Sequence, residues 1–236
     1  MRKYLIALAL GVVTGAAIFV LMLYFNPLNK QQTLSPLTVS QNEVIRLSYS
    51  AVPANSLVYT NDGESQVDPY PAKVLQLWEA TIRNSDAIAL VLNDSRNQRV
   101  GIGVKLSSDS ESTNVLNGQA IVDSVWHIYL PGRGSLFIQQ SENYWGYLRD
   151  VVIPAYWSSG DNWRGLWNAN VTAGPGALGT ARVVGGSGEF EGLRADAVEA
   201  LSARAYSVDQ GPVALDGSLA IELPGSELQP VVNPDP

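Results

Sequence analysis

After residue 42, most of the chain alternates between apolar and polar residues with a period of two, and this limits the fold more than any other sequence feature. In residues 213–223, Leu215, Leu219 and Ile221 share one parity, while Asp216 lies on the other. Such alternation is typical of a strand with one buried and one solvated face. The pattern and the turn residues between segments predict strands at 43–50, 56–60, 85–92, 98–106, 120–130, 134–140, 163–172, 177–185, 194–206 and 213–223.

The strand over residues 98–106 follows the same rule. Its apolar parity holds Val100, Ile102, Val104 and Leu106. Lys105 lies on the other parity, together with Arg99, Gly101 and Gly103, so the sequence predicts that this lysine faces solvent.

About eight to ten short strands, with no βαβ rhythm and no fixed repeat, predict an antiparallel sheet that closes or stacks to hide its edges. The fold class is therefore all-β, and the leading geometry over residues 43–224 is a closed antiparallel barrel of about eight strands, with a two-sheet sandwich as the alternative. Residues 141–152 predict one short amphipathic helix, with Ser141 as its N-cap and Pro154 beyond its end. Residues 71–83 fit either a helix or a strand.

The N-terminus predicts a separate element. Residues 4–25 carry no charge and would form about 33 Å of helix, enough to cross a hydrocarbon core of about 30 Å. We interpret residues 1–25 as a cytoplasmic stub and a transmembrane signal anchor, in preference to a cleaved signal peptide. Arg2 and Lys3 before the span place the domain outside the cytoplasm, in the periplasm if the source is bacterial. Residues 26–42 would be a linker and residues 225–236 a disordered tail.

Composition excludes several functions. Residues 31–236 hold 12 of the 15 basic residues and all 22 acidic ones, a net charge of −10, so nucleic acid is not an expected partner. Cysteine is absent, and His127 is the only histidine, which leaves no expected metal site. Residues 174–179 match GxGxxG by letter, but a strand follows where a dinucleotide fold needs a helix, so we expect no cofactor.

Residues 177–224 contain a strand, then the corner Gly185-Gly186-Ser187-Gly188-x-Phe190-x-Gly192, a long strand, a turn and a final alternating strand. This order resembles the closing part of the allene oxide cyclase and dirigent-type β-barrel proteins. The glycines would permit a tight corner, and Phe190 would plug that end of the barrel. The resemblance implies a barrel that holds an apolar molecule, sometimes as a cyclase or isomerase, and often a dimer or trimer.

The alternation of residues along one strand also indicates a candidate catalytic residue. In the strand over 194–206, Glu199 shares a face with Ala197, Leu201, Ala203 and Ala205, whereas Arg204 shares the other face with Tyr206. One of the two charges should point into the barrel, and the small apolar face favours Glu199, unless a bulge lets both reach water. A buried carboxyl group with a raised pKa could transfer a proton, so Glu199 is the candidate catalytic residue.

Aromatic residues complete the candidate site, because flat rings line apolar cavities with few rotors to fix. The expected ligand-binding residues are Trp126, Trp163, Trp167, Arg204 and Tyr206. The sequence thus predicts a membrane-anchored barrel that binds an apolar, lipid- or terpenoid-like molecule and acts as an isomerase or cyclase if it is an enzyme. The alternative is a non-catalytic carrier, or a structural or assembly subunit with a filled barrel. Self-association into a homo-oligomer is a further prediction.

Overall fold

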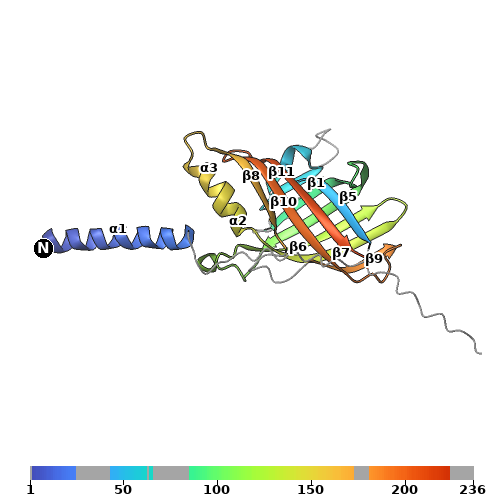
Figure 1. Ribbon diagram of the computed structural model, residues 1–236, viewed down its shortest axis with the longest axis horizontal. Coiled ribbons are helices and arrows are strands. Elements are labelled where there is room, and N and C mark those ends of the chain that lie inside the picture. The colour runs from blue at the N-terminus through green and yellow to red at the C-terminus, as the bar shows by residue number, and fades with distance from the viewer. Residues whose placement is uncertain (1, 25–42, 63, 66–84, 173–180, 224–236) are drawn as a thin grey trace, which may run out of the picture.

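The computed structural model describes residues 2–24, 43–62, 64–65, 85–172 and 181–223, and its main body is an antiparallel β-barrel (Figure 1). The strands are β1 (Val44–Ser50), β2 (Val58–Asn61), β3 (Glu64–Ser65), β4 (Ser85–Asn93), β5 (Arg99–Asp109), β6 (Ile121–Leu130), β7 (Gly134–Asn143), β8 (Asn162–Asn170), β9 (Ala181–Gly188), β10 (Ala195–Ser207) and β11 (Gly211–Glu222). The helices are α1 (Arg2–Tyr24), α2 (Trp145–Tyr147) and α3 (Ile153–Trp157), with a π-helical turn at Leu148–Val152 and 3-10 turns at Pro53–Asn55 and Val115–Asn117.

Eight strands close the barrel in the order β1-β11-β10-β9-β7-β6-β5-β4. The ring closes where β1 meets β4, with Ser48 opposite Asn93. Two additions lie outside the ring: β2 and β3 extend the sheet from β4, and β8 pairs with the later part of β10. The predicted closed antiparallel barrel is therefore confirmed, as are all ten predicted strands within the described residues. Residues 71–83, the linker, the tail and residues 177–180 of the ninth predicted strand lie outside those residues.

The strand β5 reverses the predicted inside and outside. Lys105 is only 6% exposed and lies within the barrel, whereas Ile102 and Leu106 are exposed on its outer surface. The reason is space, because a Cβ atom at Gly103 would lie 2.8 Å from the ring of Trp126, whose side chain fills the interior there. Beside the Trp126 ring only glycine fits on the inner face of β5. Gly101 and Gly103 therefore point inward together with Lys105, and the branched apolar residues point outward.

The glycine-rich corner at the end of β9 has the predicted conformation. Phe190 is 2% exposed and belongs to the core at that end of the barrel. Gly188 and Gly192 adopt positive φ values of 66° and 72°, which L-residues with a side chain rarely adopt. The corner therefore folds Phe190 back onto the barrel end.

The predicted helix over 141–152 is displaced along the chain. Pairing between β6 and β7 continues until Ile121 lies opposite Asn143, so strand hydrogen bonds hold the backbone through residue 143. Ser141 is a strand residue whose hydroxyl donates to Asp123, and it caps no helix. The helical turns instead cover 145–157, and Pro154 lies in the first turn of α3 rather than beyond the end.

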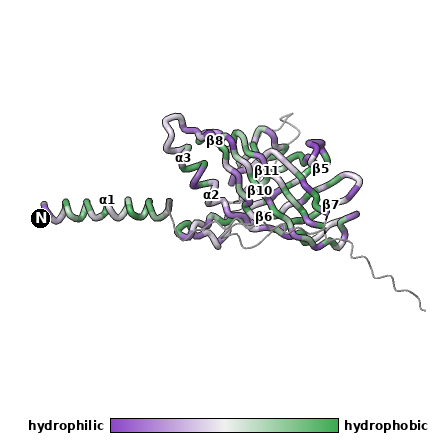
Figure 2. The backbone as a smooth tube through the Cα atoms, viewed as in Figure 1, coloured by the Kyte–Doolittle hydropathy of each residue, from purple (hydrophilic) through white to green (hydrophobic). Residues whose placement is uncertain are grey.

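The N-terminal element is a helix, α1, with apolar residues along much of its length (Figure 2). Among the helices that the structure describes, none is long and apolar enough to cross a membrane. The prediction of a transmembrane anchor over residues 4–25 is therefore not supported. The extracytoplasmic location, which depended on that anchor, stays a prediction.

Two adjacent glycines in β9 test the packing of the corner. A Cβ atom at Gly186 would lie 2.5 Å from the backbone oxygen of Phe190 and 2.7 Å from that of Ser135, and neither oxygen can rotate away. Gly186→Ala should therefore lower the free energy of unfolding by about 1–3 kcal/mol in urea denaturation. At Gly185 the nearest atom is 4.0 Å away, so Gly185→Ala should have little effect. Equal effects of the two variants would contradict this account of the corner.

Candidate functional site

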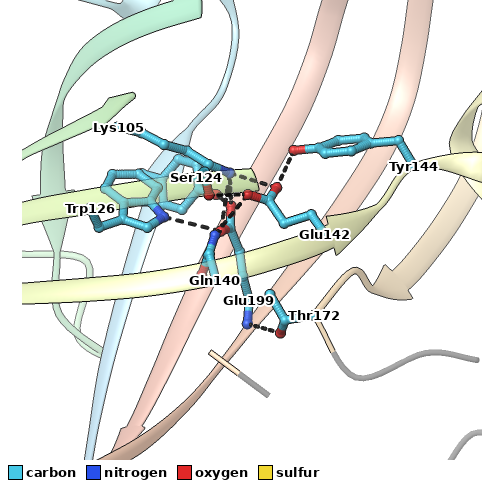
Figure 3. A network of polar contacts seen from close by, with 9 residues as sticks. Lys105, Ser124, Trp126, Gln140, Glu142, Tyr144, Thr172 and Glu199 are labelled. Carbon is cyan, nitrogen blue, oxygen red and sulfur yellow. Dashed lines mark hydrogen bonds and ion pairs between the residues drawn. The ribbon is translucent and has the colours of Figure 1, made fainter. Parts of the chain in front are cut away.

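A cluster of buried polar side chains lies inside the barrel, where five of its strands converge (Figure 3). Its charged members are Lys105 from β5, Glu142 from β7 and Glu199 from β10, and both glutamates are 0% exposed. The uncharged members are Tyr49 from β1, Ser124 and Trp126 from β6, Gln140 from β7, and Tyr144 just after β7. The closed sheet brings these residues together although they span about 150 positions of the sequence.

Lys105 is the centre of the cluster. Its Nζ lies 2.7 Å from Oε2 of Glu142 and 2.9 and 3.1 Å from the two carboxylate oxygens of Glu199. Burial alone would lower the pKa of Lys105, but the charges and hydrogen bonds of the two carboxylates outweigh burial and raise it. Lys105 therefore stays an ammonium at neutral pH, and a Schiff base, which needs a neutral amine, is not the chemistry of this site.

Glu199 accepts hydrogen bonds from four side chains. Besides Lys105, the indole Nε1 of Trp126 donates over 3.1 Å, and Gln140 Nε2 and the Tyr49 hydroxyl also donate. Its own backbone N–H donates to Thr172 Oγ1 over 2.9 Å. Burial would raise the pKa of Glu199, but the charge of Lys105 and the hydrogen bonds from Tyr49, Lys105 and Gln140 lower it. The raised pKa that we expected of a proton donor is thus reversed.

Glu142 is held in the same way from the other side of Lys105. Gln140 Nε2 donates to it over 2.9 Å, and the hydroxyls of Ser124 and Tyr144 donate as well. Gln140 contacts both glutamates and thus joins the two carboxylates that share Lys105. Every charge in the cluster is therefore paired and hydrogen-bonded, which is the condition for tolerating charges in a protein interior.

A cavity of about 250 Å³ lies beside this cluster at one end of the barrel. It is lined by Tyr49, Ala51, Tyr59, Thr60, Asp86, Ile88, Lys105, Ser107, Val122, Trp126, Tyr144, Tyr147, Glu199, Leu201, Pro212 and Leu215. The end of β1, the beginnings of β4, β6 and β11 and the later part of β5 meet at this barrel end. Strands β2 and β10 and the segment just after β7 supply the rest of the described lining. The site thus combines a mostly apolar and aromatic wall with a charged inner surface.

The structure places two of the predicted site residues at the cavity and the others away from its described lining. Glu199 lines the cavity, as the parity of its strand suggested, and Trp126 lines it as well. Trp163, Trp167 and Tyr206 instead pack against the core from the side of β8 and the later part of β10, and the cavity lining does not include them. The predicted roles of these three residues in ligand binding, and of Glu199 in catalysis, stay predictions.

Arg204 and His127 lie on the outer surface. Arg204 forms an exposed ion pair with Asp216, and the ring of His127 stacks on Phe137 with the ring centroids 4.6 Å apart. The predicted inward direction of Glu199 is confirmed, while Arg204 lies outside the described cavity lining and its predicted role in ligand binding stays a prediction.

Lys105, Glu142, Gln140 and Tyr49 were missed as site residues. Lys105 seemed solvent-facing, and Glu142 fell inside the predicted helix. The usable signal was the alternation of Gly101, Gly103 and Lys105, because paired glycines on one strand face indicate bulky neighbours and hence an inner face.

Within the described ranges, no group of three or more Asp, Glu or His side chains is placed to hold a metal ion. In the buried cluster the ammonium of Lys105 takes the position between two carboxylates that a cation would need.

Comparisons with known proteins find similarity among solved structures alone. No family model matches the chain, and no curated protein matches it. Among solved structures, the pterocarpan synthase dirigent protein GePTS1 is similar over 84% of this chain and 95% of its own, with 11% identity and a TM-score of 0.38. This match adds no argument to the resemblance of residues 177–224 to allene oxide cyclase and dirigent-type barrels. At this identity and TM-score it carries no inference about activity.

Removing the shared cation tests the buried cluster. Lys105→Met leaves two carboxylates buried side by side without a counter-charge, so the free energy of unfolding should fall by about 3–5 kcal/mol. Arg204→Met, which removes an exposed ion pair, should cost no more than about 1 kcal/mol. Urea denaturation of both variants provides the comparison, and similar losses would show that the cluster is not the stabilising element proposed.

The directions of the pKa shifts predict that the free energy of unfolding is highest over a middle range of pH and falls on an acid limb and on an alkaline limb. The pKa of Glu199 is below its ordinary value of 4.5, so its contribution is present above about pH 4.5 and is lost as the pH falls through the folded-state pKa. The pKa of Lys105 is above 10.5, and burial and the nearby carboxylates raise the pKa of Tyr49 and Tyr144 well above 10.0. Those contributions are present below about pH 10 and are lost at higher pH. Unfolding midpoints from pH 3 to 11 should show both limbs, and Glu199→Gln should flatten the acid limb.

Proposed function

We propose that the barrel binds one small, largely apolar molecule in the cavity beside Lys105 and Glu199. The observation that carries the proposal is the cavity itself, about 250 Å³ in volume and lined mainly by aromatic and aliphatic side chains with a few convergent polar groups. The opposite end of the barrel is packed with Leu92, Leu130, Leu136 and Phe190, all at most 3% exposed. This contrast between the two ends favours a binding protein over a structural subunit with a filled barrel.

The cavity volume limits the ligand. A dry cavity of about 150 Å³ holds one benzene ring, so about 250 Å³ suits a molecule of one or two rings. A long-chain lipid would leave most of its length outside. We therefore narrow the expected lipid- or terpenoid-like ligand to a compact cyclic molecule.

An isomerase or cyclase is the second candidate, because Glu199 lies in the cavity wall with the Tyr49 hydroxyl donating to it. Acting on a substrate would require Glu199 to exchange one of its four donors for the substrate. The saturated hydrogen bonding of the carboxylate favours binding without a catalytic step as the first candidate.

Self-association also stays a proposal. The outer face of the adjacent strands β5, β6 and β7 carries exposed apolar residues that a second copy could cover, namely Ile102, Leu106, Val125, Tyr129 and Phe137.

A cavity-blocking variant tests the binding proposal. Ala51 lines the cavity, so Ala51→Trp should fill part of it and weaken binding of toluene and naphthalene by about tenfold or more. Ala220 lies on the outward parity of β11, between the buried Leu219 and Ile221, and Ala220→Trp is the matched control. The perturbation of tryptophan indole N–H resonances on titration measures binding. Binding by the wild type and both variants with equal affinity would contradict the assigned cavity.

A further inference from the structure

We propose that the ligand of this cavity is an organic cation, a protonated amine carried on an aromatic or cyclic body. The inference rests on the proposed binding function and adds the charge of the ligand. It depends on three features: the net charge of the buried cluster, the aromatic walls, and a hydroxyl group with no hydrogen-bond partner among the residues that the structure describes.

The first feature is an unbalanced charge. Lys105 contributes one positive charge, and Glu142 and Glu199 contribute one negative charge each, so the buried cluster has a net charge of −1. Asp86, which also lines the cavity, adds another carboxyl group. Among the described residues of the lining, Lys105 is the one basic residue, so the charge of this part of the site favours a positive ligand.

Hydrogen bonding supports the ionised state of both glutamates. The indole N–H of Trp126, the amide NH₂ of Gln140 and the ammonium of Lys105 can only donate. All three donate to Glu199, and two of them donate to Glu142. These three donors could not accept the proton of a carboxyl group, which would have to go to a hydroxyl, that of Tyr49 at Glu199 or those of Ser124 and Tyr144 at Glu142.

Lys105 has no donor left for a ligand. Its Nζ has three close carboxylate contacts, which match the three protons of an ammonium. An anionic ligand such as a fatty acid would therefore meet no free donor from Lys105 and would face the excess negative charge of the cluster. An incoming ammonium group would instead offset that charge.

The walls of the cavity suit a cation. Five aromatic side chains contribute to the lining, namely Tyr49, Tyr59, Trp126, Tyr144 and Tyr147. A cation within about 6 Å of an aromatic centroid is attracted by the ring's negative face. One such contact already exists here, because the Lys105 ammonium lies 5.5 Å from the centroid of the Trp126 ring.

The third feature is the hydroxyl of Tyr147. The residue is 8% exposed and lines the cavity, and within the described residues its buried hydroxyl oxygen has no hydrogen-bond partner. Buried polar atoms are seldom left unpaired, so this oxygen indicates a missing partner in the cavity. An ammonium N–H is a suitable donor to it.

Matched probes test the proposal on the full-length protein at pH 7. Benzylamine (a cation), toluene (neutral) and benzoate (an anion) have similar size, and 1-naphthylmethylamine, 1-methylnaphthalene and 1-naphthoate extend the set to two rings. The amines should bind about tenfold or more tightly than their neutral counterparts, and the carboxylates should bind least. Equal or tighter binding of the neutral compounds would overturn the cation proposal and leave the binding function intact. Binding of none of the six would overturn both.

Three variants locate the selectivity. Asp86→Asn removes an exposed carboxylate at the cavity and should weaken amine binding several-fold, more than it changes toluene binding. Asp123→Asn removes an exposed charge on the outer face of β6 and should change neither. Tyr147→Phe should weaken amine binding by about three- to tenfold. Equal effects of the two aspartate variants, or equal losses for amine and neutral probes, would contradict the proposed recognition.

Discussion

The ion cluster of Glu142, Lys105 and Glu199 is the constraint on which the rest of the site depends. Two carboxylates and one ammonium could not remain inside a barrel unless every charge had partners, because an unpaired buried charge costs several kcal/mol. Donors from β6, β7, β1 and the segment after β7 meet that requirement. Several of these donors belong to the tryptophan and tyrosine side chains that form the cavity wall. The hydrogen bonds that stabilise the charges therefore also hold the cavity wall in place.

Packing explains why the cluster has room. Tyr49 and Trp126 have large aromatic side chains inside the eight-stranded barrel, and each side chain lies against a glycine. A Cβ atom at Gly217 would overlap the ring of Tyr49, and one at Gly103 would crowd Trp126. Large residues facing small ones is how a barrel interior reaches close packing without strain. At the other end branched side chains and Phe190 fill the interior, so the space is confined to the end that carries the charges.

Sequence periodicity predicted the barrel because apolar and polar residues alternate along each strand with a fixed period. That period does not depend on which strand is the neighbour. Periodicity predicted the inward direction of Glu199 for the same reason. It failed at Lys105, because parity separates two faces without saying which one is inside, and the answer lay in Trp126 on the neighbouring strand. It also failed at Glu142, where strand pairing with β6 overrides a local helical pattern. Tyr49, Lys105, Glu142 and Glu199 lie far apart in the sequence, so no local spacing could unite them.

The most direct measurement concerns the charge of the cluster. Glutamate carboxyl carbons report their ionisation in ¹³C NMR spectra, and Glu142→Gln and Glu199→Gln assign the two signals. At pH 7 in the ligand-free protein, both carboxyl groups should show the shift of an ionised carboxylate, which gives the cluster its net charge of −1 beside Lys105. A protonated carboxyl group on either residue at pH 7 would make the cluster neutral, and it would contradict the proposed basis for selecting a cation.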